Sequence, residues 1–430
     1  MGSFDTALSA LQAYSTAINA VGNNLANMST TGFKTSNVNF EDVMSTTLNA
    51  GNTQVGNGVQ EPTTEANFGQ GTVSNTGVAL DAAIQGNGFF LLAPAGSTGA
   101  VSASSYEYTR DGSFQVGSNG TLEAADGSEV QGWSLNPTTG VVDTSGAVGN
   151  ISIPTGSVIP PVATSTLSVA ANLNASAAVG DTLSVPITVY DSDGGSHQLT
   201  LTMTNTAANT WGLSLSSTDP TIQNGSNLSS LLSTTSLTFA NGALDPTTPT
   251  AITIKGLDYT ATSGIPNQPT ITWSPWTTAP SGSPAAGGVS GLTQYSQASA
   301  VSSVLQNGTP AGTLSSVAIA NGGAVMATFS NGAQEQIGQI AVAGVQNPDS
   351  LVNIGNNEWA AGATTVTLPA SVPETGGAGQ IVGESLESSN VDIATQFTNL
   401  ITYQSGYQAA SRVITTQDQM IQQLMSIIQP

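Results

Sequence analysis

Cysteine is absent from the 430-residue sequence, and basic residues are scarce: four lysines and arginines face 26 aspartates and glutamates. Without cysteine, disulfides, thiol catalysis and cysteine-ligated metal sites are excluded. The formal net charge of −22 would repel a phosphate backbone, so we predict no nucleic-acid binding. Charged residues make up only 7% of the sequence, which leaves Ser, Thr, Asn and Gln to keep the surface soluble.

Long apolar runs are also missing. No uninterrupted run approaches the roughly 18 residues of a membrane-spanning helix, so we predict no membrane insertion. The N-terminus has neither the basic start nor the apolar stretch of a secretory signal peptide. If the protein is exported, we expect a route that cleaves no signal peptide.

The longest pattern that is present lies at the C-terminus, where residues from about Ser389 to Gln429 predict one long helix. Apolar residues are spaced alternately by four and three once Gln404, Ser411 and Asp418 fill the gaps, a period of about 3.5 that is typical of a coiled-coil seam. Ser389 with Asp392 fits a capping box at the start of this helix. The predicted seam residues are Ile393, Phe397, Leu400, Tyr407, Ile414, Ile421, Met425 and Ile428.

A matching pattern lies at the N-terminus, with Ser15 and Gly22 at its intervening positions. Because a long helix must bury its apolar stripe, we expect the two termini to pack together in an axial domain, residues 1–30 and 390–430. The alternative is an ordinary buried helical pair within one domain. The N-terminal seam residues are Phe4, Leu8, Leu11, Ile18 and Leu25.

The middle of the chain predicts β-structure. Short runs rich in β-formers are separated by Asn-Gly and Asp-Gly turns, which are strong hairpin signals, and residues 183–204 form the clearest hairpin pattern. We therefore predict a mainly β fold with long α-helical termini and two nested β-rich domains. The predicted parts are an extended connector (31–70), a first β domain (71–158 and 312–389) and an inserted outer β domain (159–311).

Residues that could carry chemistry are few. His197 is the sole imidazole, and it follows a D-S-D-G-G turn, where a hairpin-flanking polar role competes with a Ser-His-Asp arrangement. Asp191, Asp193 and Gly194 in that turn resemble part of a calcium loop, but the ligands of an EF-hand at its later positions are missing. Only a weak surface cation site is left open there. We predict no catalytic residue, no cofactor and no dedicated metal site.

Several segments together resemble one known family. N-N-L-A-N-M-S-T-T-G-F-K (23–34) is similar to the N-terminal signature of bacterial flagellar hook proteins, within the axial family of rod, hook and hook-associated proteins. L-E-S-S-N-V-D-I-A (386–394) and the segment 401–420 resemble the C-terminal signature. Met28 stands where many relatives have Asn. The middle of the chain also carries similar segments, at 81–90, 108–114, 189–197, 329–332 and 337–343.

This resemblance implies a subunit that polymerises with itself into a tube, with terminal helices lining the inside and β domains outside. It implies an extracellular place in the flagellum, export by the flagellar type III apparatus, and contacts with the distal rod protein, the hook cap and the hook–filament junction proteins. The length favours a hook protein over a rod protein. The alternatives are another flagellar axial protein, namely a distal rod or hook-associated protein, and a secreted coiled-coil adhesin or carbohydrate-binding module.

Three of the scarce cations, Lys34, Arg110 and Arg412, lie in the segments that resemble the family. We predict that each pairs with a carboxylate at a subunit contact, and a solvated or intramolecular partner is the alternative. The surplus of carboxylates and the sequence pI of about 4.1 lead to the further hypothesis that assemblies of this chain tolerate acid.

Overall fold

The structure is a computed structural model that describes residues 3–43, 46–47, 54–55, 58–97, 105–136, 138–156, 158–222, 224, 226–245, 247–249, 251–258, 270–275 and 291–428. The chain divides into two compact units. The terminal unit comprises Met1–Thr155, Ser316–Ala327 and Gln334–Pro430, and the inserted unit comprises Gly156–Ser315 and Thr328–Ala333.

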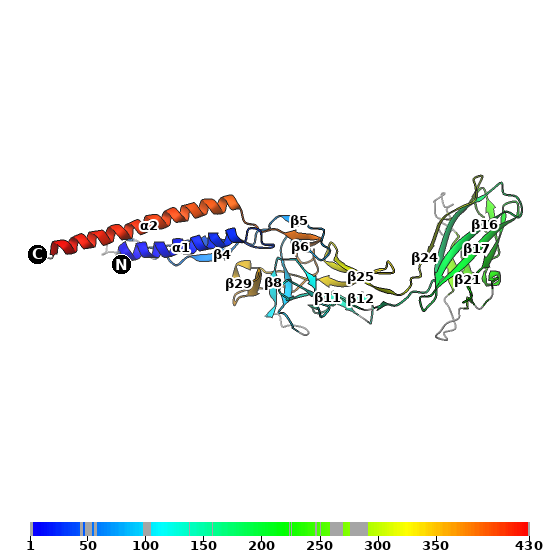
Figure 1. The fold of residues 1–430 in the computed structure, drawn as a ribbon, viewed down its shortest axis with the longest axis horizontal. Helices are drawn as coiled ribbons and strands as arrows, with labels where there is room; N and C mark the ends of the chain where they lie inside the picture. The colour runs from blue at the N-terminus through cyan, green and yellow to red at the C-terminus, as the bar shows by residue number, and fades with distance from the viewer. Residues whose placement is uncertain are drawn as a thin grey trace. The chain divides into compact units, whose positions relative to one another are not determined.

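Two helices begin and end the terminal unit, α1 (Ser3–Ala26) and α2 (Ile393–Ile428). They lie side by side, and α2 continues beyond the start of α1 (Figure 1). The helix predicted to begin near Ser389 begins instead at Ile393, because Asp392 is its cap: the Asp392 carboxylate accepts a hydrogen bond from the Thr395 amide at 3.0 Å. Ser389 accepts from the Val391 amide in the preceding turn.

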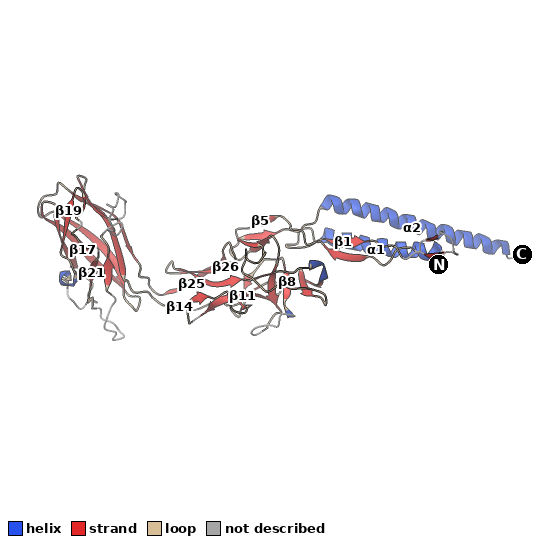
Figure 2. Cartoon of the chain, turned by 180° about the vertical axis from the view of Figure 1, so that it is seen from behind, coloured by secondary structure: helices blue, strands red, loops and turns tan. Residues whose placement is uncertain are grey.

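The β-structure of the terminal unit is built from many short strands (Figure 2). The central sheet contains the run β26-β27-β11-β7-β8-β30-β29, in which β26 spans Ala324–Phe329. Smaller ladders join β1 with β4, β2 with β3, β6 with β31 and β5 with β32. The strands of this unit are β1 (Ser36–Asn39), β2 (Thr46–Thr47), β3 (Gln54–Val55), β4 (Thr63–Ala66), β5 (Val73–Asn75), β6 (Ala82–Gln85), β7 (Phe89–Ala93), β8 (Glu107–Thr109), β9 (Gln115–Val116), β10 (Leu122–Glu123), β11 (Glu129–Asn136), β12 (Val141–Val142), β13 (Gly149–Asn150), β27 (Gln334–Ile340), β28 (Val342–Ala343), β29 (Leu351–Gly355), β30 (Glu358–Ala361), β31 (Gln380–Gly383) and β32 (Ser385–Glu387).

An aromatic cluster forms part of the core of the terminal unit. Phe89, Tyr108 and Trp359 are buried, and Phe68 packs edge-on against Phe89 at a ring-centroid distance of 5.4 Å. Because β6 pairs with β31 and β5 pairs with β32, segments from the two ends of the sequence are held in the same unit. Residues 31–70, predicted as an extended connector, contain the ladder in which Ser36 pairs with Ala66.

The inserted unit has the strand order β16-β17-β18-β19-β20-β23-β15-β22-β21, and β24 pairs with β15. The predicted hairpin is confirmed, since β16 and β17 pair antiparallel from Thr182↔Thr204 to Tyr190↔Ser196. Its strands are β14 (Val158–Ile159), β15 (Thr166–Asn174), β16 (Thr182–Tyr190), β17 (Ser196–Ala207), β18 (Thr210–Ser216), β19 (Ser236–Ala240), β20 (Ala243–Leu244), β21 (Ile252–Ile254), β22 (Ile271–Trp273), β23 (Leu292–Tyr295) and β24 (Ala300–Gln306). Two further strands, β25 (Gly312–Ile319) and β26 (Ala324–Phe329), have residues in both units.

Strict alternation of buried and exposed residues organises the inserted unit. On β17 every second residue points inward, from His197 through Leu199, Leu201 and Met203 to Asn205. This period of two matches the pleat of a strand with one buried face. The structure confirms the predicted fold class, a mainly β chain with helical termini.

Candidate assembly surface

Small and polar side chains form the contact between α1 and α2. On α1 the most buried positions include Ala7, Ala17, Val21 and Asn24, and on α2 they are Gln396 and Ala410. Small residues allow the two helix backbones to approach closely. The pair is therefore held by side chains that do not stand out in the apolar pattern of the sequence. Most of the large apolar side chains of α2 stay exposed beside this contact.

Three aromatic rings pack against one another beside this helix pair. The Tyr14 ring lies 6.5 Å from the Tyr403 ring and 5.7 Å from the Phe40 ring, and Phe40 and Tyr403 are 5.8 Å apart. Near the C-terminal end of α1, the side-chain amide of Asn24 donates to Gln396 Oε1 at 3.2 Å. Asn24 also donates to the Ser36 carbonyl and accepts from the Ser36 amide, each at 2.9 Å. These buried polar bonds fix the register of α1 against α2 and β1.

The phase of the contact differs by one residue from the predicted seam. The buried positions Ala7, Ala17 and Asn24 each precede a predicted seam residue, namely Leu8, Ile18 and Leu25. Gln396 in the same way precedes Phe397. The heptad spacing is present, but tertiary packing selects the stripe of small residues, because these let the helices come closer.

The predicted seam residues flank this contact rather than fill it. Phe397 is 47% exposed, Ile421 53% and Met425 63%. Exposed seam residues are Phe4, Leu8, Ile393, Phe397, Tyr407, Ile421 and Met425; half-buried ones are Leu11, Ile18, Leu25, Leu400 and Ile414; the side chain of Ile428 lies outside the described residues. The two helices thus leave most of their large apolar side chains without cover from the described part of the same chain.

Lys34 and Arg110, predicted at subunit contacts, lie instead in one buried intramolecular site. Lys34 Nζ donates to Glu387 Oε1 at 2.6 Å and to the Gly69 carbonyl at 2.9 Å. Arg110 Nη1 donates to Glu387 Oε2 at 3.2 Å, and Nη2 donates to the Gly86 carbonyl at 2.7 Å. Glu387 is fully buried, so the physical reason for the placement is that each buried charge needs a partner of opposite sign.

This ion triad joins three parts of the chain. Lys34 follows α1, Glu387 ends β32 shortly before α2, and Arg110 follows β8 in the sheet. Burial lowers the pKa of Lys34 and the pKa of Arg110, while the Glu387 carboxylate counteracts this by favouring their charged forms. Arg110 also lies over the Phe89 ring, 5.3 Å from its centroid. The triad therefore anchors the segment that follows α1 and the segment that precedes α2 to the β-rich part of the terminal unit.

Gly32 makes that anchoring possible. It adopts a φ of +69°, and a Cβ at this position would lie 2.7 Å from the Arg110 carbonyl carbon. Its amide donates to the Glu387 carbonyl at 2.8 Å. Only glycine allows this backbone to pass so close. Arg412, the third predicted cation, is exposed on α2, and its role at a subunit contact stays a prediction.

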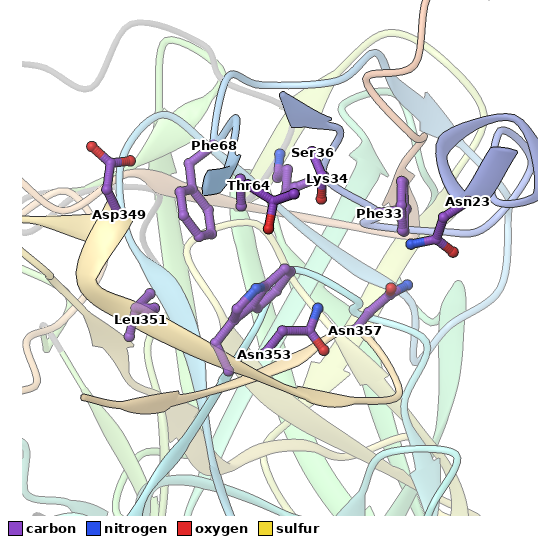
Figure 3. A pocket seen from close by; sticks show the side chains of 12 residues that line it. Asn23, Phe33, Lys34, Ser36, Thr64, Phe68, Asp349, Leu351, Asn353 and Asn357 are labelled. Carbon is purple, nitrogen blue, oxygen red and sulfur yellow. The ribbon is translucent and has the colours of Figure 1, made fainter. Parts of the chain in front are cut away.

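A small polar pocket lies beside this anchor (Figure 3). Its volume is about 210 Å³, and Figure 3 shows residues from the start of the chain along one side and residues of the β29–β30 hairpin along the other. Asn357 in its wall donates to the Thr31 carbonyl at 2.8 Å, and Lys34 is paired with Glu387. These polar groups already bond within the chain, so we assign no ligand to the pocket.

His197 has partners that the sequence did not reveal. Its Nε2 lies 3.0 Å from Asp191 Oδ2, and its Nδ1 lies 2.9 Å from Asp219 Oδ2 and 2.9 Å from Thr221 Oγ1. Among the described residues, no group of three or more His, Asp or Glu side chains is placed to hold a metal ion. Within the same part of the chain, no helix is both long and apolar enough to cross a membrane.

Comparison with known families covers most of the chain. The Flagella basal body rod protein model matches residues 4–34, and the Flagellar hook protein FlgE/F/G D1 domain model matches 83–173. The Flagellar basal body protein FlaE D2 domain model matches 162–309, and the Flagellar basal body rod FlgEFG protein C-terminal model matches 382–427. The matches thus extend over both helices and the inserted unit.

Individual relatives agree with these models over their full lengths. The flagellar hook protein FlgE of Salmonella typhimurium is 30% identical over 441 residues, which cover 99% of this chain and 100% of the relative. The flagellar hook protein FlgE of Treponema pallidum is 30% identical over 475 residues, with 99% of each chain covered. The chain therefore belongs to the family of flagellar hook proteins.

Proposed function

We propose that this protein is the structural subunit of the flagellar hook, and that it polymerises into the flexible tube that joins rod to filament and transmits torque. The observation that carries the proposal is the uncovered apolar surface of the helix pair. A hook subunit has neighbours that can cover such a surface, whereas an isolated protein would expose it to water at a cost in free energy.

The cost is largest at the end of α2. Residues 419–428 contain no charged side chain, and the large apolar residues there are exposed: Met420, Ile421, Leu424, Met425 and Ile427. Burial of one such side chain contributes about 1.5–3 kcal/mol. Burial of all five side chains against neighbouring copies would offset part of the entropy cost that a subunit incurs when it joins a polymer.

We assign the parts of the chain accordingly. Residues 1–30 and 390–430 are the axial domain, in which the predicted seam residues meet neighbouring copies, and 31–70 connect it to the β-structure. The first β domain (71–158 and 312–389) and the inserted outer domain (159–311) make lateral contacts. Their surfaces are rich in Ser, Thr, Asn and Gly, and polar, hydrated contacts can be exchanged as a bent tube rotates.

The finer assignments follow from the family. We propose that the protein is exported uncleaved by the flagellar type III apparatus and works outside the cell. Its partners would then be further copies of itself, the distal rod protein, the hook cap and the hook–filament junction proteins. We propose no catalysis and no cofactor.

Electron microscopy of the purified full-length protein after assembly tests this function. We expect curved tubes of helically arranged subunits. Straight, rigid tubes would favour the distal rod alternative, and discrete trimers would favour a secreted adhesin. Either outcome would overturn the hook assignment.

A further inference from the structure

The only histidine of the sequence, His197, lies on β17 of the inserted unit. His197 begins the inward-facing row of β17 and is 6% exposed. The next three residues of this row are apolar, so burial of the imidazole requires other partners for its ring nitrogens. The partners come from two different connections, the turn after β16 and the loop after β18.

Each ring nitrogen of His197 faces a carboxylate oxygen at hydrogen-bond distance, Asp191 on one side and Asp219 on the other. A neutral imidazole carries one N–H, so one of its nitrogens would direct a lone pair at a carboxylate oxygen. The imidazolium form carries two N–H groups and donates to both carboxylates. Thr221 Oγ1 also lies 2.9 Å from Nδ1, but its hydrogen is donated to Asp219 Oδ1 at 2.6 Å, so Nδ1 faces two acceptor oxygens, Thr221 Oγ1 and Asp219 Oδ2. The geometry thus fits the charged ring.

The first carboxylate also builds the turn that it belongs to. Asp191 Oδ1 accepts hydrogen bonds from the amides of Asp193 and Gly195, at 2.9 and 2.7 Å, while Oδ2 faces His197. The ring of His197 therefore ties the 191–195 turn to β17. The ionisable groups that face the ring are Asp191 and Asp219, and Asp193 lies in the same turn.

The turn in question packs against the neck, by which we mean residues 158–164 and 306–313, the paired segments at which the chain enters and leaves the folded β-structure of the inserted unit. A Cβ at Gly194, whose φ is +88°, would lie 2.9 Å from Pro161 Cβ and 3.2 Å from the Ala311 amide nitrogen. The turn thus touches both segments of the neck. The glycine is required there because a side chain would push the turn off them.

Hydrogen bonds tie the neck together at the same level. Val162 and Thr309 exchange two backbone hydrogen bonds of 2.9 Å. The Thr164 amide donates to the Tyr190 carbonyl at 2.9 Å, and the Tyr190 amide donates to Thr164 Oγ1 at 2.8 Å. Because Asp191 follows Tyr190 directly, a shift of the clamped turn would strain these bonds.

We propose that His197, charged and held between Asp191 and Asp219, is a pH-sensitive clamp on the neck of the inserted unit. With its proton, the ring holds the 191–195 turn against Pro161 and Ala311. Loss of the proton turns one of the two carboxylate contacts repulsive and loosens the turn. The clamp is a property of the inserted unit alone and goes beyond the proposed function.

Protonation of the two carboxylates, Asp191 and Asp219, sets the lowest pH at which the clamp can hold. Hydrogen bonds from Thr221 lower the pKa of Asp219. Burial raises the pKa of Asp191, but hydrogen bonds from His197 and Gly195 outweigh burial and leave it lowered. A carboxyl group with a lowered pKa contributes stability that is present above its ordinary value, about 3.9, and is lost as the pH falls through the lower folded value. The two carboxylates therefore keep the negative charge that faces the ring throughout mild acid, and this sets the lower pH limit of the clamp.

Hydrogen exchange on the full-length, unassembled protein tests the clamp. The amides to follow are those of Val162, Thr164, Tyr190 and Thr309, with exchange rates corrected for the intrinsic effect of pH. In the unsubstituted protein we expect about tenfold stronger protection at about pH 5.5 than at about pH 9, the scale of one hydrogen bond to a charged group. Protection that does not change with pH would overturn the proposal.

Substitutions separate the clamp from a purely structural role. His197→Gln should exchange faster than the unsubstituted protein at about pH 5.5 and equally fast at about pH 9. An equal difference at both pH values would mean that the ring only fills space, and the proposal would fail. If His197→Gln does not fold, Asp219→Asn serves instead, with the same expectation.

Asp245→Asn is the matched control for Asp219→Asn. Asp245 Oδ1 accepts from the amide and the hydroxyl of Thr247 at 2.8 and 2.6 Å, and Asp219 Oδ1 accepts from Thr221 at 2.9 and 2.6 Å. The two turns are alike except that Asp219 also meets His197. Asp245→Asn should leave the pH dependence of neck protection unchanged. The measurement needs no polymer, so a failure of tube assembly would not affect its outcome.

Discussion

The Tyr14 ring of α1 occupies the space beside Gly406 of α2, where an added Cβ would lie 2.5 Å from the nearest ring carbon. The ring has little freedom to move away, because Phe40 and Tyr403 both pack near it. Gly406 interrupts a long helix at a position where glycine costs helix stability, about 1 kcal/mol relative to alanine. The close passage of the tyrosine is the physical reason for that glycine.

Gly406→Ala should therefore weaken the helix pair despite the better helix propensity of alanine. We expect a net loss of about 1–3 kcal/mol, the usual cost of overpacking a close contact. Urea unfolding followed by helical circular dichroism measures it. Gly22→Ala on α1 is the control, since nothing lies within 4 Å of its added Cβ, and it should raise stability by up to about 1 kcal/mol. A stabilising Gly406→Ala would contradict the packing argument.

Removal of the shared counter-charge of the ion triad should be more damaging. Glu387→Gln leaves Lys34 and Arg110 buried beside each other without a carboxylate. We expect a loss of about 3–5 kcal/mol in the free energy of unfolding, as for other buried pairs that lose one partner. Urea midpoints compared with those of Glu65→Gln, an exposed substitution on β4, measure the effect. Equal midpoints for the two variants would rule out the anchoring role.

Much of the fold follows from local patterns in the sequence. The period of about 3.5 at both termini predicts the helices, and strict alternation with Asp-Gly turns predicts the β16–β17 hairpin. The phase of the helix contact could not be predicted in this way. Large apolar residues such as Phe397 dominate the pattern, whereas the contact forms through Ala17 and Gln396, because close approach favours small and polar groups at this interface.

The ion triad and the contacts of His197 could not be predicted from the sequence either, for a different reason. Lys34 and Glu387 are 353 positions apart, so no spacing rule connects them. Asp219 follows β18 and meets His197 only because β17 and β18 pair antiparallel. The scarcity of cations draws attention to Lys34 and Arg110, but it does not say which carboxylate they meet, and Arg412, which carries the same signal, is exposed on α2.

A charge on the exposed stripe of α2 should block assembly without unfolding the subunit. Ile421 is 53% exposed, so Ile421→Asp should leave the free energy of unfolding of the subunit, measured with urea, within about 0.5 kcal/mol of its original value. In the polymer the same carboxylate would be buried against a neighbour, at a cost of several kcal/mol. Gln423→Asp, exposed on the opposite face of the same helix turn, is the control. Sedimentation of assembled tubes should fail for Ile421→Asp and succeed for Gln423→Asp; the reverse pattern would place the contact on the other face.

Glu358 of β30 is 6% exposed and lies near two further carboxylates, Asp126 and Glu107. Burial, with the repulsion of Asp126 and then of Glu107, raises the pKa of Glu358 from its ordinary 4.5 to about 8. The folded chain therefore holds a proton that the unfolded chain has released between these pH values. In the sign convention of proton linkage, this stability is fully present below pH 4.5 and is lost as the pH rises through about 8.

Glu358→Gln should remove that pH dependence, because an amide keeps a donor where the protonated carboxyl has one and never ionises. Between about pH 5 and pH 9 we expect the free energy of unfolding of the unsubstituted subunit to fall by roughly 1–3 kcal/mol more than that of Glu358→Gln, because ionised Glu358 would be a buried charge beside Asp126 and Glu107. Urea midpoints measured at several pH values give the two curves. Parallel curves would show that Glu358 releases its proton without consequence. The direction of the effect favours acid, as the excess of carboxylates in this chain also does, since each proton taken up below neutral pH removes a like charge from a subunit of formal net charge −22.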